Sequence, residues 1–326
     1  MPVVDVHTHM LNDDWLRRIR EHGGPHYTVG DFRDQEVIFM DGAPFMTLTE
    51  GMFDYGLRIK NMDAAGVDIA IVSLTCPSVY WGGAEISLDV ARMMNDDMAA
   101  QQRARPDRIR WFASLPWQYP DLAIQELTRA CGNGAVGVFV TANVRGMSLT
   151  DKSLAPVWDA IDKQGLPVLV HPSAPPGVGE MDMGKYNLVA SVGFVFDTSL
   201  AVSRMIFDGF FDRYRNLKII AAHGGGYLPY LAGRLDICYE NMPSCRENIS
   251  RLPSTYLPEI YYDSVLFTQE ALELCVGVGG ADNVLYGSDY PHNIGDMKGC
   301  LTRVDALPSD QRKKIRGENA MRIFGL

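Results

Sequence analysis

Two histidines near the N-terminus, His7 and His9, are the first residues whose type and spacing suggest chemistry. They end the apolar run Val3-Val4-Asp5-Val6-His7-Thr8-His9. In a β-strand, side chains two residues apart point to the same face, so both imidazoles could bind one metal ion. A bare His-x-His pair also occurs on protein surfaces. The rest of the chain must therefore decide whether this pair is a metal site.

Three further polar residues end or follow apolar runs in the same way. His171 follows Val168-Leu169-Val170, His223 follows Ile219-Ile220-Ala221-Ala222, and Asp289 follows Val284-Leu285-Tyr286-Gly287-Ser288. Burying so many polar groups without a shared task is costly. We therefore expect them to meet His7 and His9 at one rim.

The other three histidines are not expected to bind a metal. His22 and His26 lie in a polar segment and are expected to be solvated. His292 follows Asp289-Tyr290-Pro291 on the last loop, where it could face the site without being a ligand.

Eight short apolar runs alternate with helical patterns along the chain. The runs are Val3 to Val6, Asp68 to Leu74, Ile109 to Leu115, Ala135 to Val140, Pro167 to Val170, Leu217 to Ala222, Ile260 to Val265 and Asn283 to Tyr286. The helical stretches include Ser87 to Ala104, Pro120 to Cys131, Ser153 to Lys163, Phe196 to Phe211 and Thr268 to Val276. This order predicts an α/β fold, a (β/α)8 TIM barrel, whose active site lies at the carboxyl ends of the strands.

The segment at about 10–52 interrupts this alternation. It contains the turn signals Gly23-Gly24-Pro25 and Asp41-Gly42, and we expect a small hairpin that covers the barrel mouth. No repeat or linker divides the chain, so residues 1–326 are expected to form one barrel with this insertion.

Composition narrows the function classes. A formal net charge of -10 without a basic cluster argues against nucleic-acid binding. Six cysteines without Cys-x-x-Cys spacing are expected to be free thiols of a cytoplasmic protein. We expect no signal peptide, no apolar run of membrane-spanning length and no membrane partner. Gly224-Gly225-Gly226 lacks the features of a phosphate loop, so no nucleotide cofactor is expected.

Several motifs in order make the chain similar to a known family. They are VDVHTHM at the N-terminus, Met94-Asn95-Asp96, HGGGYLPYLAGR, GSDYP and the closing Gly317-Glu318-Asn319-Ala320. The sequence resembles the amidohydrolase superfamily, within the branch of metal-dependent nonoxidative decarboxylases typified by aminocarboxymuconate semialdehyde decarboxylase.

The resemblance implies a role for each rim residue. His7, His9, His171 and Asp289 would bind one divalent metal, usually Zn²⁺ and in some relatives Mn²⁺, and His223 would be the acid–base residue beside the metal-bound water. Two-metal members of the superfamily use a carboxylated lysine at the end of strand four. This sequence has Val140-Thr141-Ala142-Asn143 there, which predicts a single metal.

The resemblance also bears on substrate and assembly. An arginine that holds substrate carboxylate in the family aligns with Met46, whereas a second family arginine, supplied by the neighbouring subunit, matches Arg234. A homodimer or a dimer of dimers is therefore expected. Candidate residues for an apolar pocket that holds a flat ring are Phe45, Met46, Trp81, Tyr186, Phe194 and Tyr290.

The expected activity is nonoxidative decarboxylation of a small aromatic or unsaturated carboxylic acid, such as a hydroxybenzoate or a carboxymuconate semialdehyde, in aromatic-compound catabolism. Asp289 and His223 would be the catalytic residues, and Asp289 would shuttle a proton as well as bind the metal. Three alternatives remain at this point: a hydrolase of an ester, lactone or amide, a hydratase of an unsaturated acid, and a barrel with a structural metal.

Overall fold

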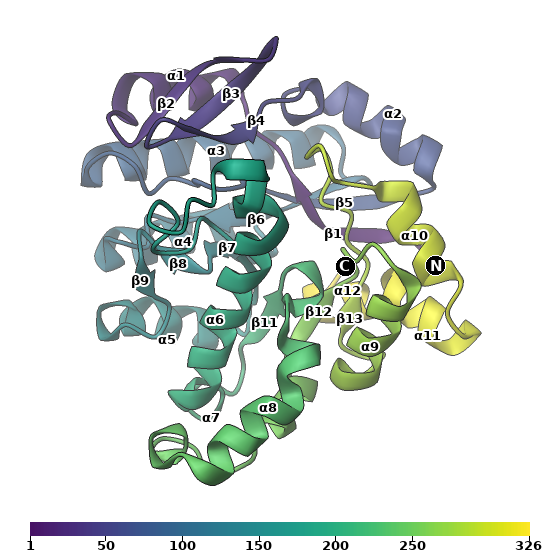
Figure 1. Cartoon of the computed structure of the whole chain (residues 1–326). Coiled ribbons are helices and arrows are strands. Elements are labelled where there is room, and N and C mark those ends of the chain that lie inside the picture. Colours follow the sequence, from purple (N-terminus) through teal and green to yellow (C-terminus); the bar gives the residue numbers. More distant parts are fainter.

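Eight parallel strands form the centre of the molecule, in a computed structural model that describes residues 1–326 (Figure 1). Their hydrogen-bonded order is β1 (Val4–His9), β5 (Ile69–Ser73), β6 (Ile109–Ser114), β7 (Gly137–Thr141), β10 (Pro167–His171), β11 (Lys218–Ala221), β12 (Tyr261–Asp263) and β13 (Val284–Leu285). The last strand returns to the first, because Val6 N donates to Tyr286 O at 3.0 Å and Asp289 N donates to His7 O at 2.8 Å. The prediction of a TIM barrel is confirmed.

Helices surround the strands. They are α2 (Tyr55–Ala65), α3 (Ala84–Ala104), α4 (Pro120–Gly132), α5 (Ala155–Gln164), α6 (Phe194–Phe207), α7 (Phe210–Arg213), α8 (Leu228–Asn241), α9 (Gln269–Gly279), α10 (Met297–Asp305), α11 (Ser309–Lys313) and α12 (Asn319–Phe324). The single helix expected over Phe196 to Phe211 is two helices, because Gly209 adopts φ +66° between α6 and α7.

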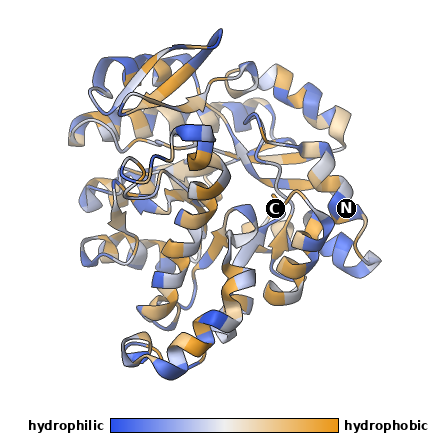
Figure 2. Ribbon diagram, viewed as in Figure 1, coloured by the Kyte–Doolittle hydropathy of each residue, from blue (hydrophilic) through white to orange (hydrophobic).

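The barrel interior is apolar at the end opposite the carboxyl ends of the strands. Val4 and Val6 pack there with Phe112, Phe139 and other inward residues. The ring of Phe324, from α12, packs edge-on against the Phe112 ring, with 5.5 Å between the ring centroids. Figure 2 shows the hydrophobic residues concentrated on the strands and on helix faces. Polar groups inside the barrel are therefore gathered at its other end, where chemistry occurs in this fold.

The 10–52 segment contains more than the expected hairpin. It holds α1 (Asp13–His22) followed by β2 (Tyr27–Phe32), β3 (Gln35–Met40) and β4 (Ala43–Thr47), which form a three-stranded antiparallel sheet. The expected turn between β3 and β4 is present, with Asp41 at φ 51° and Gly42 at φ 82°. Figure 1 shows α1 and this sheet beside one side of the barrel.

One helical segment, Lys185–Phe207, is long and apolar enough to cross a membrane by length and composition alone. The expectation that no run reaches that length was therefore wrong for this segment. Half of its most apolar stretch is buried inside the molecule. A core helix with one buried face passes the same test, so the segment is weak evidence for a membrane span.

Candidate metal centre

The carboxyl ends of β1, β10, β11 and β13 bring together the five polar residues that the sequence singled out. His7 and His9 come from β1 and His171 ends β10, whereas His223 and Asp289 follow β11 and β13. All five are buried, with exposed fractions between 0% and 8%. The ligand-capable atoms of His7, His171, His223 and Asp289 lie within 4.8 Å of one another.

Three of these histidines share one hydrogen-bonding pattern. The Nδ1 atoms of His7, His9 and His171 lie 2.6 Å from Asp263 Oδ2, 2.9 Å from Leu74 O and 2.8 Å from Pro172 O. A carbonyl or ionised carboxylate oxygen can only accept a hydrogen bond, so each Nδ1 carries the proton. Each Nε2 then presents a lone pair to the interior, as metal-binding histidines do.

The inward-facing atoms of these residues lie close together. His7 Nε2 and His9 Nε2 are 3.1 Å apart, and Asp289 Oδ1 lies 3.4 Å from the first and 3.2 Å from the second. His171 Nε2 is buried without a hydrogen-bond partner. Three imidazole nitrogens and one carboxylate are a donor set that suits a divalent metal. The residues present therefore fit the expected ion.

Electrostatics favour the metal-binding forms of three of these groups. Burial lowers the pKa of His9 to about 3 and that of His171 well below its ordinary value, so both imidazoles are neutral. Burial opposes ionisation of Asp289, but its close contacts with His223 and His9 hold its pKa well below the usual range. For His7, burial lowers the pKa but the opposing charge of Asp263 raises it overall.

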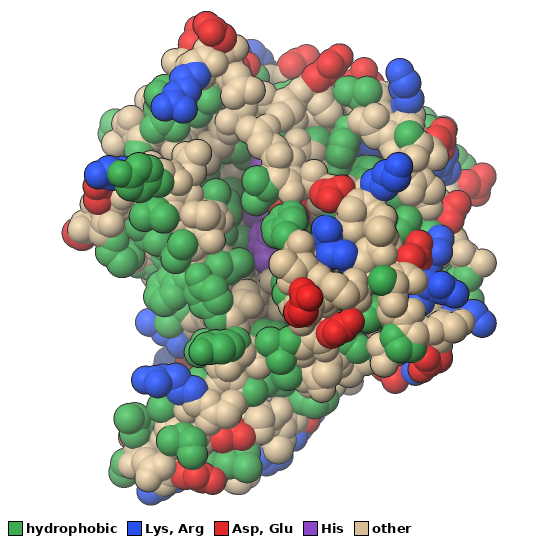
Figure 3. All heavy atoms as spheres, turned by 45° about the vertical axis from the view of Figure 1, so that its right-hand side comes forward, with side chains coloured by type: hydrophobic (Ala, Val, Ile, Leu, Met, Phe, Trp, Pro, Cys, Tyr) green, Lys and Arg blue, Asp and Glu red, His purple; other side chains and the backbone are tan.

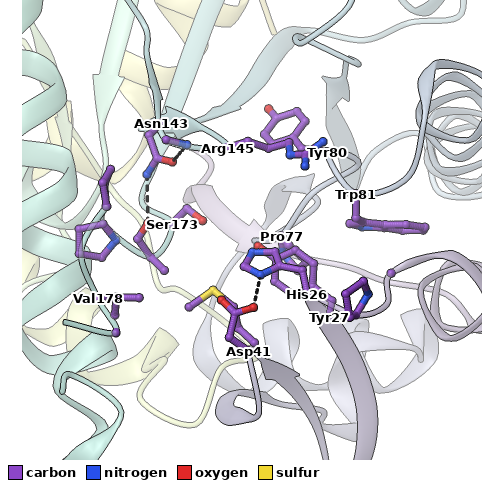
Figure 4. Close-up of a pocket in the computed structure, with 18 of the residues that line it drawn as sticks. His26, Tyr27, Asp41, Pro77, Tyr80, Trp81, Asn143, Arg145, Ser173 and Val178 are labelled. Atoms are coloured by element: carbon purple, nitrogen blue, oxygen red, sulfur yellow. Dashed lines mark hydrogen bonds and ion pairs between the residues drawn. The ribbon is translucent and has the colours of Figure 1, made fainter. Parts of the chain in front are cut away.

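The structure also contains a cavity of about 1010 Å³ that none of the five cluster residues lines (Figure 4). Its walls come from the 10–52 segment and from the loops after β5, β7 and β10. Ser173 on one wall follows His171 by two residues, and Pro77 on another follows Leu74, the acceptor for His9, by three. Figure 3 shows histidine side chains at the bottom of a hollow on the surface. The cavity is therefore linked to the cluster through the loops that follow β5 and β10.

A family model described as Amidohydrolase matches residues 4–326. The chain belongs to the amidohydrolase family. It is 31% identical over 331 residues to 2-amino-3-carboxymuconate-6-semialdehyde decarboxylase of Dictyostelium discoideum, over 99% of this chain and 91% of the relative. A solved 5-carboxyvanillate decarboxylase from Sphingomonas paucimobilis matches with a TM-score of 0.87 and 26% identity, over 100% and 99% of the two chains.

A further solved structure, a dihydroxybenzoic acid decarboxylase from Polaromonas sp. with bound manganese and the inhibitor 2-nitroresorcinol, shares the fold. It matches with a TM-score of 0.84 and 24% identity, over 100% of this chain and 97% of that one. The expected resemblance is confirmed: the chain belongs to the metal-dependent decarboxylase branch of the family and is a carboxy-lyase.

The structure places the expected substrate residues of this decarboxylase in different surroundings. Trp81 lines the cavity, whereas Met46 is buried on β4. The Phe45 and Phe194 rings pack edge-on, with 6.1 Å between their centroids. The Tyr290 ring lies 4.8 Å from the Arg58 guanidinium, and its hydroxyl accepts a hydrogen bond from Asn61 Nδ2 at 2.9 Å.

Three further expected residues lie near the surface. Tyr186 is 81% exposed. His22 and His26 lie outside the metal cluster, and His26 Nδ1 is 2.6 Å from Asp41 Oδ1. Both His22 and His26 line the 1010 Å³ cavity instead.

Sequence reasoning missed two residues of this decarboxylase. Asp263 is buried and binds His7 Nδ1, and it also accepts hydrogen bonds from His223 N at 2.9 Å and Gly224 N at 3.0 Å. Its position at the end of the Ile260 to Val265 run, on the strand before the one that leads to Asp289, was the available signal. The second is Arg145, the only Lys or Arg that lines the cavity.

Proposed function

We propose that this decarboxylase removes CO2 from a small aromatic or unsaturated carboxylic acid, such as a hydroxybenzoate or a carboxymuconate semialdehyde. The observation that carries this proposal is the pair of Nε2 atoms of His7 and His9, 3.1 Å apart beside ionised Asp289. The names of the relatives, which act on acids of these classes, support it. They favour decarboxylation over hydrolysis or hydration.

His7, His9, His171 and Asp289 would hold one divalent metal in this proposal, with Zn²⁺ preferred for the three nitrogens and Mn²⁺ as the alternative. The manganese in the Polaromonas structure supports the second choice. When bound, such an ion acts as a Lewis acid that stabilises negative charge developing on the substrate.

The chain's own acid–base groups complete the reaction. When the bond to the carboxylate breaks, CO2 leaves and the electron pair stays on the substrate carbon, which must then take up a proton. Asp289 Oδ2 lies 3.6 Å from His223 Nε2, so these two groups can pass a proton between them and deliver it to that carbon. The enzyme regains the proton from solvent.

A homodimer, or a dimer of dimers, is the proposed assembly. Helix α8 extends away from the barrel in Figure 1 and exposes Tyr230 at 82% and Ile237 at 59%. Arg234 on the same helix is exposed, and no hydrogen bond or ion pair within the chain holds it. It would reach a substrate carboxylate in the neighbouring subunit. The six free cysteines support the proposal of a cytoplasmic location.

The test is CO2 release by metal-loaded protein from a panel of ortho-hydroxybenzoates and carboxymuconate semialdehydes. His171→Ala serves as the inactive variant and Asp305→Asn as the control, because Asp305 pairs with Arg316 at the surface and is outside both the cluster and the cavity lining. We expect release by the wild type and by the control but not by His171→Ala. Silence of the wild type across the panel would overturn the proposal.

A further inference from the structure

His292 lies beside the metal centre although the proposed ligand set does not include it. Its ring centroid is 5.0 Å from that of His9, and ligand-capable atoms of His9, Asp289 and His292 lie within 4.8 Å of one another. The turn after β13 fixes its place, because His292 N donates to Asp289 O at 3.1 Å and Gly295 N donates to His292 O at 2.8 Å. The side chain is therefore held next to the reacting region by the same turn that carries Asp289.

His292 differs from the three expected histidine ligands in both nitrogens. Its Nε2 lies 3.0 Å from Thr75 Oγ1, a hydroxyl that can donate or accept, rather than from a carbonyl or carboxylate that would fix the tautomer. Its Nδ1 has no hydrogen-bond partner within the chain. The residue is only half-buried, whereas His7 and His9 are fully buried. Nδ1 of His292 is thus left without a partner inside the chain.

The two oxygens of Asp289 define two flanks of the site. Oδ1 lies 3.2 Å from His9 Nε2, on the side where His292 packs, and Oδ2 lies 3.6 Å from His223 Nε2. A flat acid bound at the metal would therefore have His223 near one edge and His292 near the other.

A neutral imidazole nitrogen needs a polar partner when substrate excludes water from it. An apolar substituent would leave the nitrogen unpaired, which costs binding free energy. A hydroxyl or carbonyl oxygen on the substrate would satisfy the nitrogen in either tautomer, since neutral histidine can donate or accept there.

We propose that His292 is a substrate-binding residue whose Nδ1 forms a hydrogen bond with a hydroxyl or carbonyl oxygen of the acid, and that Thr75 is a positioning residue that orients the ring. This inference rests on the proposed function. It assigns His292 to the substrate and not to the metal. It also makes an acid with a hydroxyl or carbonyl oxygen, in addition to its carboxylate, the preferred substrate class.

The experiment compares His292→Phe and His292→Gln with the wild type and with Asp305→Asn, a control at a surface ion pair with Arg316 that is outside both the metal cluster and the cavity lining. Bound metal per chain is measured together with kcat and KM for the most active acid of the panel. We expect His292→Phe to retain its metal and to raise KM about 10- to 100-fold with a smaller change in kcat. His292→Gln, which keeps a hydrogen-bonding side chain, should recover part of the loss, and Asp305→Asn should match the wild type.

Thr75→Val separates positioning from general structural damage. Because Thr75 acts through His292, its effect on KM should disappear in the His292→Phe background, whereas two independent sites would add. Loss of metal in His292→Phe, an unchanged KM, or additive effects of the two substitutions would overturn the inference. Inactivity of the wild type on every acid would instead remove the proposed function, and the inference with it.

Discussion

At the scale of single residues, the metal centre depends on which nitrogen of each histidine carries the proton. Hydrogen bonds to Asp263, Leu74 O and Pro172 O direct the Nε2 lone pairs of three imidazoles to one point. Sequence spacing could place these histidines at a common rim but could not supply this detail. Two of the three acceptors are backbone carbonyls, which no side-chain pattern reveals.

A substitution of Asp263 tests whether the hydrogen bonds to Nδ1 set the tautomers of the metal-binding histidines. In Asp263→Asn the acceptor loses its charge, and the amide can present its NH2 group to His7 Nδ1, so the tautomer that points a lone pair inward is less favoured. We expect metal affinity to fall about 10- to 100-fold, measured by competition with a chromophoric chelator. Asp305→Asn, at a surface ion pair with Arg316, is the control. Equal affinity in both variants would contradict the account.

Asp289 has two proposed tasks, metal binding and proton transfer. An amide at this position could still contact the ion but could not take up and deliver a proton at neutral pH. We expect Asp289→Asn to lose CO2 release even in preparations that retain metal, as measured by metal content and gas release on the same sample. Metal retention with full activity would rule out this assignment.

At the scale of elements, eight strands were predictable because parallel strands buried on both faces are continuous apolar runs. Helix α1 was not, since its buried residues Trp15, Leu16 and Ile19 alternate with charged ones in a short segment that also carries turn signals. Asp263 was missed for a related reason. Its partner His7 is 256 residues away in sequence and meets it only when the barrel closes.

Close packing between strands predicts the effect of one glycine. A Cβ on Gly287 would lie 2.9 Å from His7 Cβ and 3.1 Å from Asp263 Cβ. Gly287→Ala should therefore displace β1 or β12 and lower the free energy of unfolding by about 1 to 3 kcal/mol, with weaker metal retention. Urea unfolding and metal analysis check this. Gly132→Ala, where a Cβ meets no atom within 4 Å, should be close to neutral; equal losses would refute the packing argument.

Asp197 on α6 joins the loops after β7 and β10, since it accepts hydrogen bonds from Asn143 Nδ2 and Ser173 N, both at 2.9 Å. Burial raises its pKa from 3.8 to about 6. Between these values the folded state binds more protons than the unfolded state, so the free energy of unfolding falls as pH rises through this window.

Relative to Asp197→Asn, the wild type should lose roughly 2 to 3 kcal/mol of stability between about pH 4 and pH 7. Urea unfolding of both proteins across this range measures the difference, which cancels contributions from other titrating groups. Parallel stability curves would show that Asp197 has no raised pKa.

At the scale of the whole molecule, the barrel brings residues from the beginning, middle and end of the chain to one rim, from His7 to Asp289. Fold and candidate ligands follow from sequence because both depend on residue type at strand ends. The half-buried position of His292 and the cavity between the 10–52 segment and the loops do not, because they depend on loop conformations that the apolar pattern leaves open.

The most direct test of the central claim, one divalent metal held by this histidine and aspartate cluster and required for decarboxylation, is a titration. Metal-free protein is loaded with increasing Zn²⁺ or Mn²⁺ while CO2 release from the most active acid is followed. We predict that activity rises in proportion to bound metal and stops rising at one equivalent per chain, with no response in His171→Ala. Full activity without metal, or a break at two equivalents, would contradict the account.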